Sequence, residues 1–251
     1  MIAVVVNTVA VFIGATIGLI ARRGIPERLT DRIFQALALF VVYVGITGAL
    51  GGKNTIVILL SLAIGTLLGE LADLDKLLNR FAGFVESKFT GKNKTESDPG
   101  DLKEGDPTDE TKKKSFAEAF VTTSLLQCVG AYILVAGMKA GLEGDNSMIY
   151  SKTALDFVSS IVMAASMGAG VLLAPLSIFV VTGSVVLLAQ LLEPLLSDAV
   201  IADMVSVGSL IIIAQALNML KVTDIKIMNM TPAMFLPIGL VPLYNWITGV
   251  F

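Results

Sequence analysis

The segment MIAVVVNTVAVFIGATIGLIARR (1–23) determines the class of fold that the chain can adopt. Its apolar run carries no charged residue until two arginines close it. A helix rises about 1.5 Å per residue, so the run can cross the roughly 30 Å of hydrocarbon in a bilayer. We therefore expect a transmembrane helix at 2–21. No basic residue precedes the run, as it would in a cleaved signal peptide, so this helix is expected to be kept in the mature protein.

Seven further apolar runs suit a membrane span, and they lie at 32–51, 55–72, 116–138, 150–173, 175–193, 202–220 and 231–250. The composition agrees, because 55% of the residues are hydrophobic, only 16% are charged and the mean hydropathy is +0.81. We expect an all-α fold, a polytopic transmembrane helix bundle of about eight spans. The last run contains Pro232, Pro237 and Pro242, which predict a kinked, broken or partly re-entrant span.

Basic residues are distributed unevenly between the two sides of this arrangement. The loop after the first span holds four, residues 73–115 hold nine and the loop after the seventh span holds two, which is fifteen of the 18 lysines and arginines. The opposite side holds only Lys53, Lys139 and Lys152. Because basic loops stay in the cytoplasm, we expect both termini outside and residues 73–115 in the cytoplasm.

The chain divides into three parts on this basis. Residues 1–73 hold spans one to three, and residues 116–251 hold spans four to eight. Between them, residues 74–89 place apolar and charged side chains on opposite helical faces, which predicts a cytoplasmic amphipathic helix on the membrane surface or, alternatively, docked on the ends of the bundle. Residues 91–114 have no apolar set to bury, so we expect a flexible loop.

The two ends of the chain share a weak pattern of span, proline turn, acidic residue and span. Spans one to three would correspond to spans six to eight, with Pro26 matching Pro194 and Asp31 matching Asp203. A shift of five spans, an odd number, would invert the second copy, and inverted repeats are typical of secondary transporters. Apolar helices also resemble one another by composition, so an inverted repeat and a chance likeness both stay open.

Glycines spaced four residues apart occur in three spans, at Gly14 and Gly18, Gly65 and Gly69, and Gly137 and Gly141. Each pair lies on one helical face and allows another backbone to approach closely. Packing within the chain is the simpler interpretation, and the alternative is contact between copies in a homo-oligomer.

Scarce residue types exclude several kinds of chemistry. The chain has no histidine and one cysteine, Cys128, which rules out an intrachain disulfide and any Ser-His-Asp or Cys-His site. Zinc, copper, haem and iron–sulfur sites normally need several histidine or cysteine ligands, so we expect none of them. No GxxxxGK[ST] motif and no basic stripe with aromatic residues is present. We expect no enzymatic activity, no cofactor and no nucleic-acid partner.

Polar side chains within apolar spans are the candidates for a functional site, because they are costly in hydrocarbon. Asp156 is the deepest carboxylate, and Lys152 precedes it by one helical turn. Asp156 would bind a proton or a cation, or it would be an interfacial acid satisfied by Lys152 and water. The other candidates for a solute or ion site near the midplane are Asn7, Gln127, Gln215, Asn218, Tyr43 and Thr47.

Three long stretches carry a resemblance to a known family. They are VNTVAVFIGATIGLIARRGIPERLTDRIFQALAL (6–39), SLLQCVGAYILVAGMKAGLEGDNSMIYSKTALDFVSSIVMAASMGAGV (124–171) and AVIADMVSVGSLIIIAQALNML (199–220). The chain resembles the prokaryotic membrane proteins of the YdfK and YqgA type, a family with no assigned function. The resemblance implies a location in a bacterial or archaeal inner membrane, and it implies no activity.

The leading functional hypothesis is a secondary transporter or permease for an ion or a small polar solute. Asp156 would bind the proton or cation, and the amide side chains would contact the solute. The alternative is a membrane scaffold or assembly factor, in which the same polar groups only fasten helices together. The expected partners are the lipid bilayer and a small solute or ion, and whether a metal is bound stays open.

Overall fold

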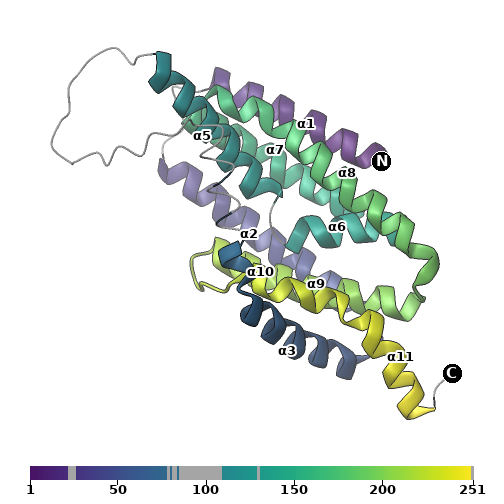
Figure 1. The fold of residues 1–251 in the computed structure, drawn as a ribbon. Coiled ribbons are helices and arrows are strands. Elements are labelled where there is room, and N and C mark those ends of the chain that lie inside the picture. Colours follow the sequence, from purple (N-terminus) through teal and green to yellow (C-terminus); the bar gives the residue numbers. More distant parts are fainter. Residues whose placement is uncertain (22–26, 78–79, 81–83, 85–108, 129–130, 250–251) are drawn as a thin grey trace.

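The computed structural model describes residues 1–21, 27–77, 80, 84, 109–128 and 131–249, and every regular element within them is helical. The all-α class expected from the sequence is confirmed. Figure 1 shows the helices in two groups that lie side by side.

The first group surrounds α7 (Ser147–Met167). Its other members are α1 (Ile2–Ile20), α5 (Asp109–Cys128), α6 (Ala131–Leu142), the short turn η1 (Ala169–Leu173) and α8 (Ala174–Leu192). Helix α1 packs along α7, and α8 packs on α6, α1 and α5.

The second group surrounds α9 (Asp198–Met219), which follows α8 through the short turn η2 (Glu193–Leu195). Its other members are α2 (Glu27–Ala49), α3 (Thr55–Ala72), α10 (Ile227–Met230), η3 (Thr231–Phe235) and α11 (Pro237–Thr248). Helix α2 packs along α9, and α3 packs on the α10–η3–α11 segment.

The described residues contain five helices that are long and apolar enough to cross a membrane: α1, most of α2, α3, η1 with α8, and α9. Two bent pairs raise the number to seven if each pair is one span: α5 with α6, bent by 56°, and the α10–η3 segment with α11, bent by 46°. The multi-pass architecture is therefore confirmed, and so is the break expected in the proline-rich last span. Helix α7, which contains Lys152 and Asp156, is long enough to span a membrane but less apolar than these helices, so the count of eight spans stays a prediction.

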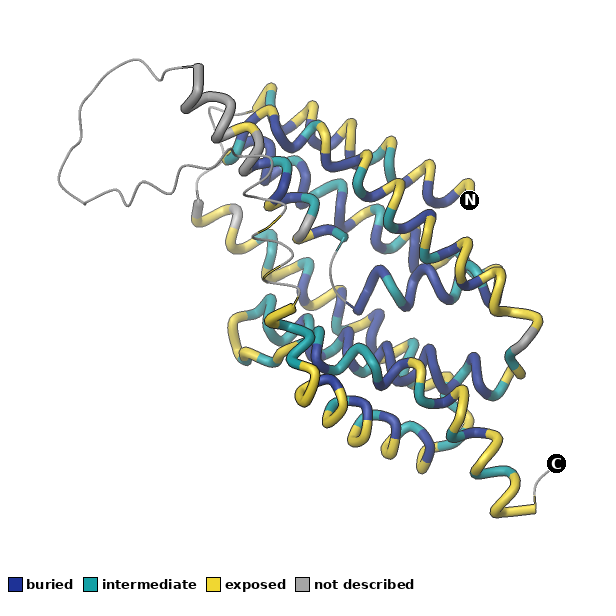
Figure 2. The backbone as a smooth tube through the Cα atoms, in the orientation of Figure 1, coloured by how far each residue is buried: buried dark blue, intermediate teal, exposed yellow. Residues whose placement is uncertain are grey.

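Outward-facing positions support a lipid environment for the bundle. In Figure 2 the exposed positions follow the outer sides of α1, α3 and α8, and the buried positions lie between the helices. The exposed side chains there include Leu59, Leu67 and Leu188, each more than half exposed. Such large apolar side chains are compatible with hydrocarbon and would be unusual as a continuous water-facing surface.

The boundary between α7 and α8 differs from the prediction. The apolar runs place it between 173 and 175, but α7 ends at Met167. Gly168 follows with φ 94°, a backbone conformation that glycine adopts easily, and η1 leads from it into α8. Apolar residues lie on both sides of this turn, so hydropathy gives no signal for it.

The three glycine pairs are used within the chain. Gly14 and Gly18 face the backbone of α7, and Gly137 and Gly141 face α8. Gly65 faces Ala233 in η3, and Gly69 faces the backbone of α10. Packing inside the chain, the simpler interpretation of these pairs, is therefore confirmed.

Asp203 holds the beginning of α3 against α9. Its side chain is completely buried, and it accepts hydrogen bonds from the backbone N–H groups of Lys53 (2.6 Å) and Asn54 (3.0 Å) and from Asn54 Nδ2 (2.9 Å). The backbone N–H of Asn54, the N-cap residue of α3, needs such an acceptor because the first N–H groups of a helix have no partner within it. Asp31, its counterpart in the proposed repeat, is exposed, so the inverted repeat stays a prediction.

The segment between α3 and α5 is only partly described. Residues 74–77, 80 and 84 are helical, and both Leu77 and Phe84 are 60% exposed. The rest of the predicted amphipathic helix 74–89 and the residues up to 108 lie outside the described residues. Helix α5 begins at Asp109, so the end of the segment 91–114, expected to be a flexible loop, is helical.

Substituting Gly69 by alanine should destabilise the fold, because the new Cβ would collide with the backbone carbonyl of Asn229. Overpacking of this kind costs about 1–3 kcal/mol. The thermal midpoint of the purified protein in detergent should fall. Gly239→Ala in α11 is the matched control, since its Cβ meets nothing within 4 Å. Equal midpoints for the two variants would contradict the packing described for α3.

A buried charge pair at the end of a cleft

Lys152 and Asp156 form an ion pair on one face of α7. The ammonium Nζ lies 2.7 Å from each carboxylate oxygen of Asp156, and both side chains are only 7% exposed. Their spacing of four residues brings them together within the helix itself. Asp156 is the tenth residue of α7, so it lies about 13 Å along the axis from the start of the helix.

Helix α1 adds an amide to this pair. Asn7 is completely buried, and its Nδ2 donates a hydrogen bond of 3.3 Å to Asp156 Oδ2. Gly14 and Gly18, further along α1, allow the close approach that keeps the two helices in contact. The Oδ1 atom of Asn7 has no hydrogen-bond partner among the described residues.

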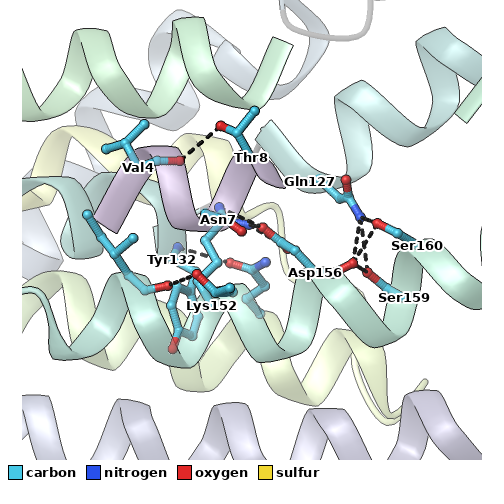
Figure 3. A network of polar contacts seen from close by, with 12 residues as sticks. Val4, Asn7, Thr8, Gln127, Tyr132, Lys152, Asp156, Ser159 and Ser160 are labelled. Carbon is cyan, nitrogen blue, oxygen red and sulfur yellow. Dashed lines mark hydrogen bonds and ion pairs between the residues drawn. The ribbon is translucent and has the colours of Figure 1, made fainter. Parts of the chain in front are cut away.

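Gln127, near the end of α5, contacts the next turn of α7. Its Nε2 lies 2.8 Å from Ser160 Oγ, 3.1 Å from Ser159 Oγ and 3.3 Å from the backbone carbonyl of Asp156 (Figure 3). Both serines also donate to that carbonyl, as expected for serines within a helix. Gln127 Oε1 is buried and unpartnered in the part of the chain that the structure describes.

The bend between α5 and α6 lies beside these residues. Helix α5 ends at Cys128, and α6 begins at Ala131. Gln215 of α9 reaches this point, since its Oε1 accepts a hydrogen bond of 3.4 Å from the backbone N–H of Tyr132. A break in a helix at membrane depth is tolerated where other groups or a water-filled cavity satisfy the freed backbone.

A cleft of about 780 Å³ connects the buried pair with the surface. Asp31, in the first turns of α2, and Lys221, just after α9, line its exposed end. Lys221 Nζ lies 3.6 Å from Asp31 Oδ1. Lys152 and Asp156 lie at its buried end. The residues lining the space between them are Phe34, Leu37, Val41, Thr122, Leu126, Gln127, Tyr132, Leu155, Ser159, Gln215, Asn218 and Met219.

The structure brings together most of the candidate residues that the sequence indicates. Four of them line the cleft: Asp156, Gln127, Gln215 and Asn218. Asn7 is not among the lining residues, but it donates a hydrogen bond to Asp156. Both polar atoms of the Asn218 side chain are already engaged by the loop after α9, through Thr223 and Ile225. Its role visible in the structure is to close that loop.

Tyr43 and Thr47 lie outside the cleft. The Tyr43 side chain is 62% exposed, and its ring centroid lies 6.2 Å from that of Phe40. Thr47 Oγ1 donates to the carbonyl of Val44 in its own helix, at 2.9 Å. The proposed repeat suggests both residues, and neither is close to the charge pair by these contacts.

Two further residues of the site carry weaker sequence signals. The sequence indicates Lys152 only as a partner for Asp156, although Lys152 lines the cleft itself. Tyr132 gives no distinct signal, because one tyrosine near the middle of an apolar run usually packs as a large apolar residue. The apolar residues of α2 that line the cleft, Phe34, Leu37 and Val41, give no sequence signal either. In sequence, an apolar side chain that faces lipid looks the same as one that faces a cleft.

Asp156→Asn should destabilise the protein, because it leaves the Lys152 ammonium buried without its counter-ion. Breaking one member of a buried pair costs about 3–5 kcal/mol, whereas replacing both by apolar residues of similar size is often neutral. The double variant Lys152→Met with Asp156→Leu should therefore have a higher thermal midpoint than Asp156→Asn in detergent. A double variant that unfolds at a lower temperature than the single one would contradict this account of the pair.

Comparison with known proteins agrees with a membrane location. The model of a family described as protein of unknown function, DUF554, matches residues 2–242. The uncharacterized membrane protein YdfK of Bacillus subtilis is 29% identical over 241 residues, with 94% of each chain covered. The uncharacterized protein YqgA of Escherichia coli is 25% identical over 235 residues, again with 94% of each chain covered.

No solved structure matches the chain. The family match covers the charge pair, the bent α5–α6 segment and the residues that line the cleft. The match extends over almost the whole length of the sequence and agrees with the resemblance noted from its three long stretches. The chain therefore belongs to the DUF554 family of proteins of unknown function.

Proposed function

We propose that the protein is a secondary transporter or permease that moves a small polar solute or ion through the cleft between its two helix groups. The observation that carries the proposal is the cleft itself, which connects exposed charges at Asp31 and Lys221 with a buried ion pair at Lys152 and Asp156. Intramembrane charges that face a cavity are typical of substrate and ion pathways.

The broken α5–α6 segment supports the same function. Its bend of 56° lies where Gln127 and Tyr132 line the cleft. Transporters commonly place interrupted helices at their binding sites, because the free helix ends offer backbone groups to a solute. Among the described residues, the backbone N–H of Tyr132 has one long hydrogen bond, of 3.4 Å to Gln215, so a solute could compete for it.

The division into two groups offers a route to alternating access. Within each group helices pack along their lengths, whereas the groups meet mainly where α6 packs on α9, with a smaller contact between α2 and α7. Rocking one group against the other about the α6–α9 contact would close the exposed end of the cleft and open the opposite end.

The distribution of basic residues orients the cleft in a prokaryotic inner membrane. Lys221 lies at its exposed end, and Arg28 and Arg32 line a neighbouring small pocket that shares Asp31 with the cleft. The loops that carry most of the lysines and arginines are on this side. By the positive-inside rule this end faces the cytoplasm, and both termini face outward. The protein would then be observed in an inward-open arrangement, without enzymatic activity of its own.

Flux can be measured before the solute is identified. Proteoliposomes loaded with a cytosolic metabolite extract should release at least one polar metabolite, detected by mass spectrometry, faster than liposomes without protein. The variant Lys152→Met with Asp156→Leu should lose this release while it remains folded, because the charges that would contact the solute are gone.

The scaffold alternative gives the opposite result in the same assay. A scaffold would release no metabolite above the empty liposomes, and the charge-free variant would behave like the native protein. Gly239→Ala, outside the cleft, serves as the control for reconstitution, and it should release the same metabolites at the native rate.

A water-filled cleft also predicts accessibility to a polar thiol reagent. In a Cys128→Ser background, Leu37→Cys should react with a membrane-impermeant reagent in inside-out vesicles, because Leu37 lines the cleft. Leu39→Cys on the same helix should not react, although its side chain is 62% exposed, because it would face lipid. Reaction of Leu39→Cys alone, or reaction of Leu37→Cys only in right-side-out vesicles, would contradict the proposed cleft or its orientation.

A further inference from the structure

We infer that the solute is a zwitterion with an apolar body, of the class of neutral α-amino acids, and that it binds across the Lys152–Asp156 pair. This inference rests on the proposed transport function and specifies its substrate class. The carboxylate of the solute would accept from Lys152, and its ammonium group would donate to Asp156.

Charge balance is the first argument. The buried end of the cleft holds one cation and one anion 2.7 Å apart, and both are 7% exposed. Net charge at this depth is costly. A lone anion at Lys152 or a lone cation at Asp156 would leave the site charged unless a side chain also changed its protonation state. A zwitterion adds no net charge, so it can bind with both side chains ionised.

Spare bonding capacity is the second argument. An ammonium group has three donors, and a carboxylate has about four acceptor positions. Within the described residues, Lys152 Nζ donates only to Asp156, and Asp156 accepts side-chain bonds only from Lys152 and Asn7. Each member can therefore take a further partner of opposite charge.

The spacing of charges agrees with this binding mode. In an α-amino acid the nitrogen lies about 2.5 Å from the carboxyl carbon, because only two bonds separate them. The opposite charges of the protein pair are also a short distance apart, with 2.7 Å between Lys152 Nζ and each carboxylate oxygen of Asp156. The solute and the pair could thus form a closed square of alternating charges.

Neutral polar groups beside the pair can complete the site. Gln127 lines the cleft and has a buried, unpartnered Oε1, which suits an ammonium donor. The Nε2 atom of Gln215 makes no hydrogen bond to any residue that the structure describes, and it suits a carboxylate oxygen. Apolar walls for the body of the solute come from Phe34, Leu37, Val41, Leu126, Leu155 and Met219.

The volume is also suitable. Sites for small organic ligands usually measure about 300–1,000 Å³ and are mainly apolar, with a few polar groups that fix orientation. The cleft, at about 780 Å³, is within this range. An inorganic ion alone would leave most of the apolar lining without a partner.

The test compares three solutes that share one amino-acid side chain: the amino acid, its decarboxylated amine and its deaminated acid. Proteoliposomes are loaded with unlabelled leucine, valine, methionine or phenylalanine, and uptake of the same labelled amino acid is compared with uptake of its decarboxylated amine and of its deaminated acid under matched loading. At least one amino acid should be taken up about a hundredfold faster than both analogues, since each analogue leaves one buried charge without its second partner. This uptake should vanish in the Lys152→Met, Asp156→Leu variant.

The possible failures are distinguishable. Preferred uptake of the acid or of the amine, above its uptake by liposomes without protein, would overturn the zwitterion and identify a lone anion or a lone cation as the solute. No uptake of any probe, together with metabolite release that still depends on Lys152 and Asp156, would overturn the inference and leave the transport function standing. No uptake and no dependent release would overturn both.

Discussion

The ion pair between Lys152 and Asp156 is the interaction on which the rest of the site depends. Either charge alone would be costly at this depth, and together they are neutral and bonded at 2.7 Å. Local helix geometry creates the pair, because residues four apart share one face. Its surroundings then follow from the packing of α7: Asn7 of α1 satisfies one carboxylate oxygen, and the cleft lies beside the ammonium group.

Close packing within each helix group and loose packing between the groups produce the cleft. Gly14 and Gly18 fasten α1 to α7, and Gly65 and Gly69 fasten α3 to the broken last span. Asp203 adds a buried hydrogen-bonded contact between α9 and the start of α3. The two groups meet mainly at α6 and α9, so space remains between α2 and α7.

A transport pathway and a helix scaffold would use buried polar groups in different ways. A scaffold needs polar groups that satisfy one another, and Asn218 and Asp203 are used in this way. At the buried end of the cleft, the charge pair has bonding capacity to spare, and Gln127 Oε1 is one of several buried polar atoms that have no partner among the described residues. Polar groups left unsatisfied beside an open cavity are costly for stability, and binding of a solute would offset that cost.

The sequence by itself determined the helical membrane class, the glycine faces suited to close packing and the spacing that lets Lys152 pair with Asp156, because hydropathy, spacing and helix periodicity are properties of neighbouring residues. It also indicated Asn7, Gln127 and Gln215 as unusual polar residues in apolar runs. Only the tertiary structure decided that these meet, that Tyr43 points elsewhere, and that α2 lines a cleft. Such contacts join residues on different helices, 149 positions apart in the case of Asn7 and Asp156, and no local pattern encodes which helix faces will meet.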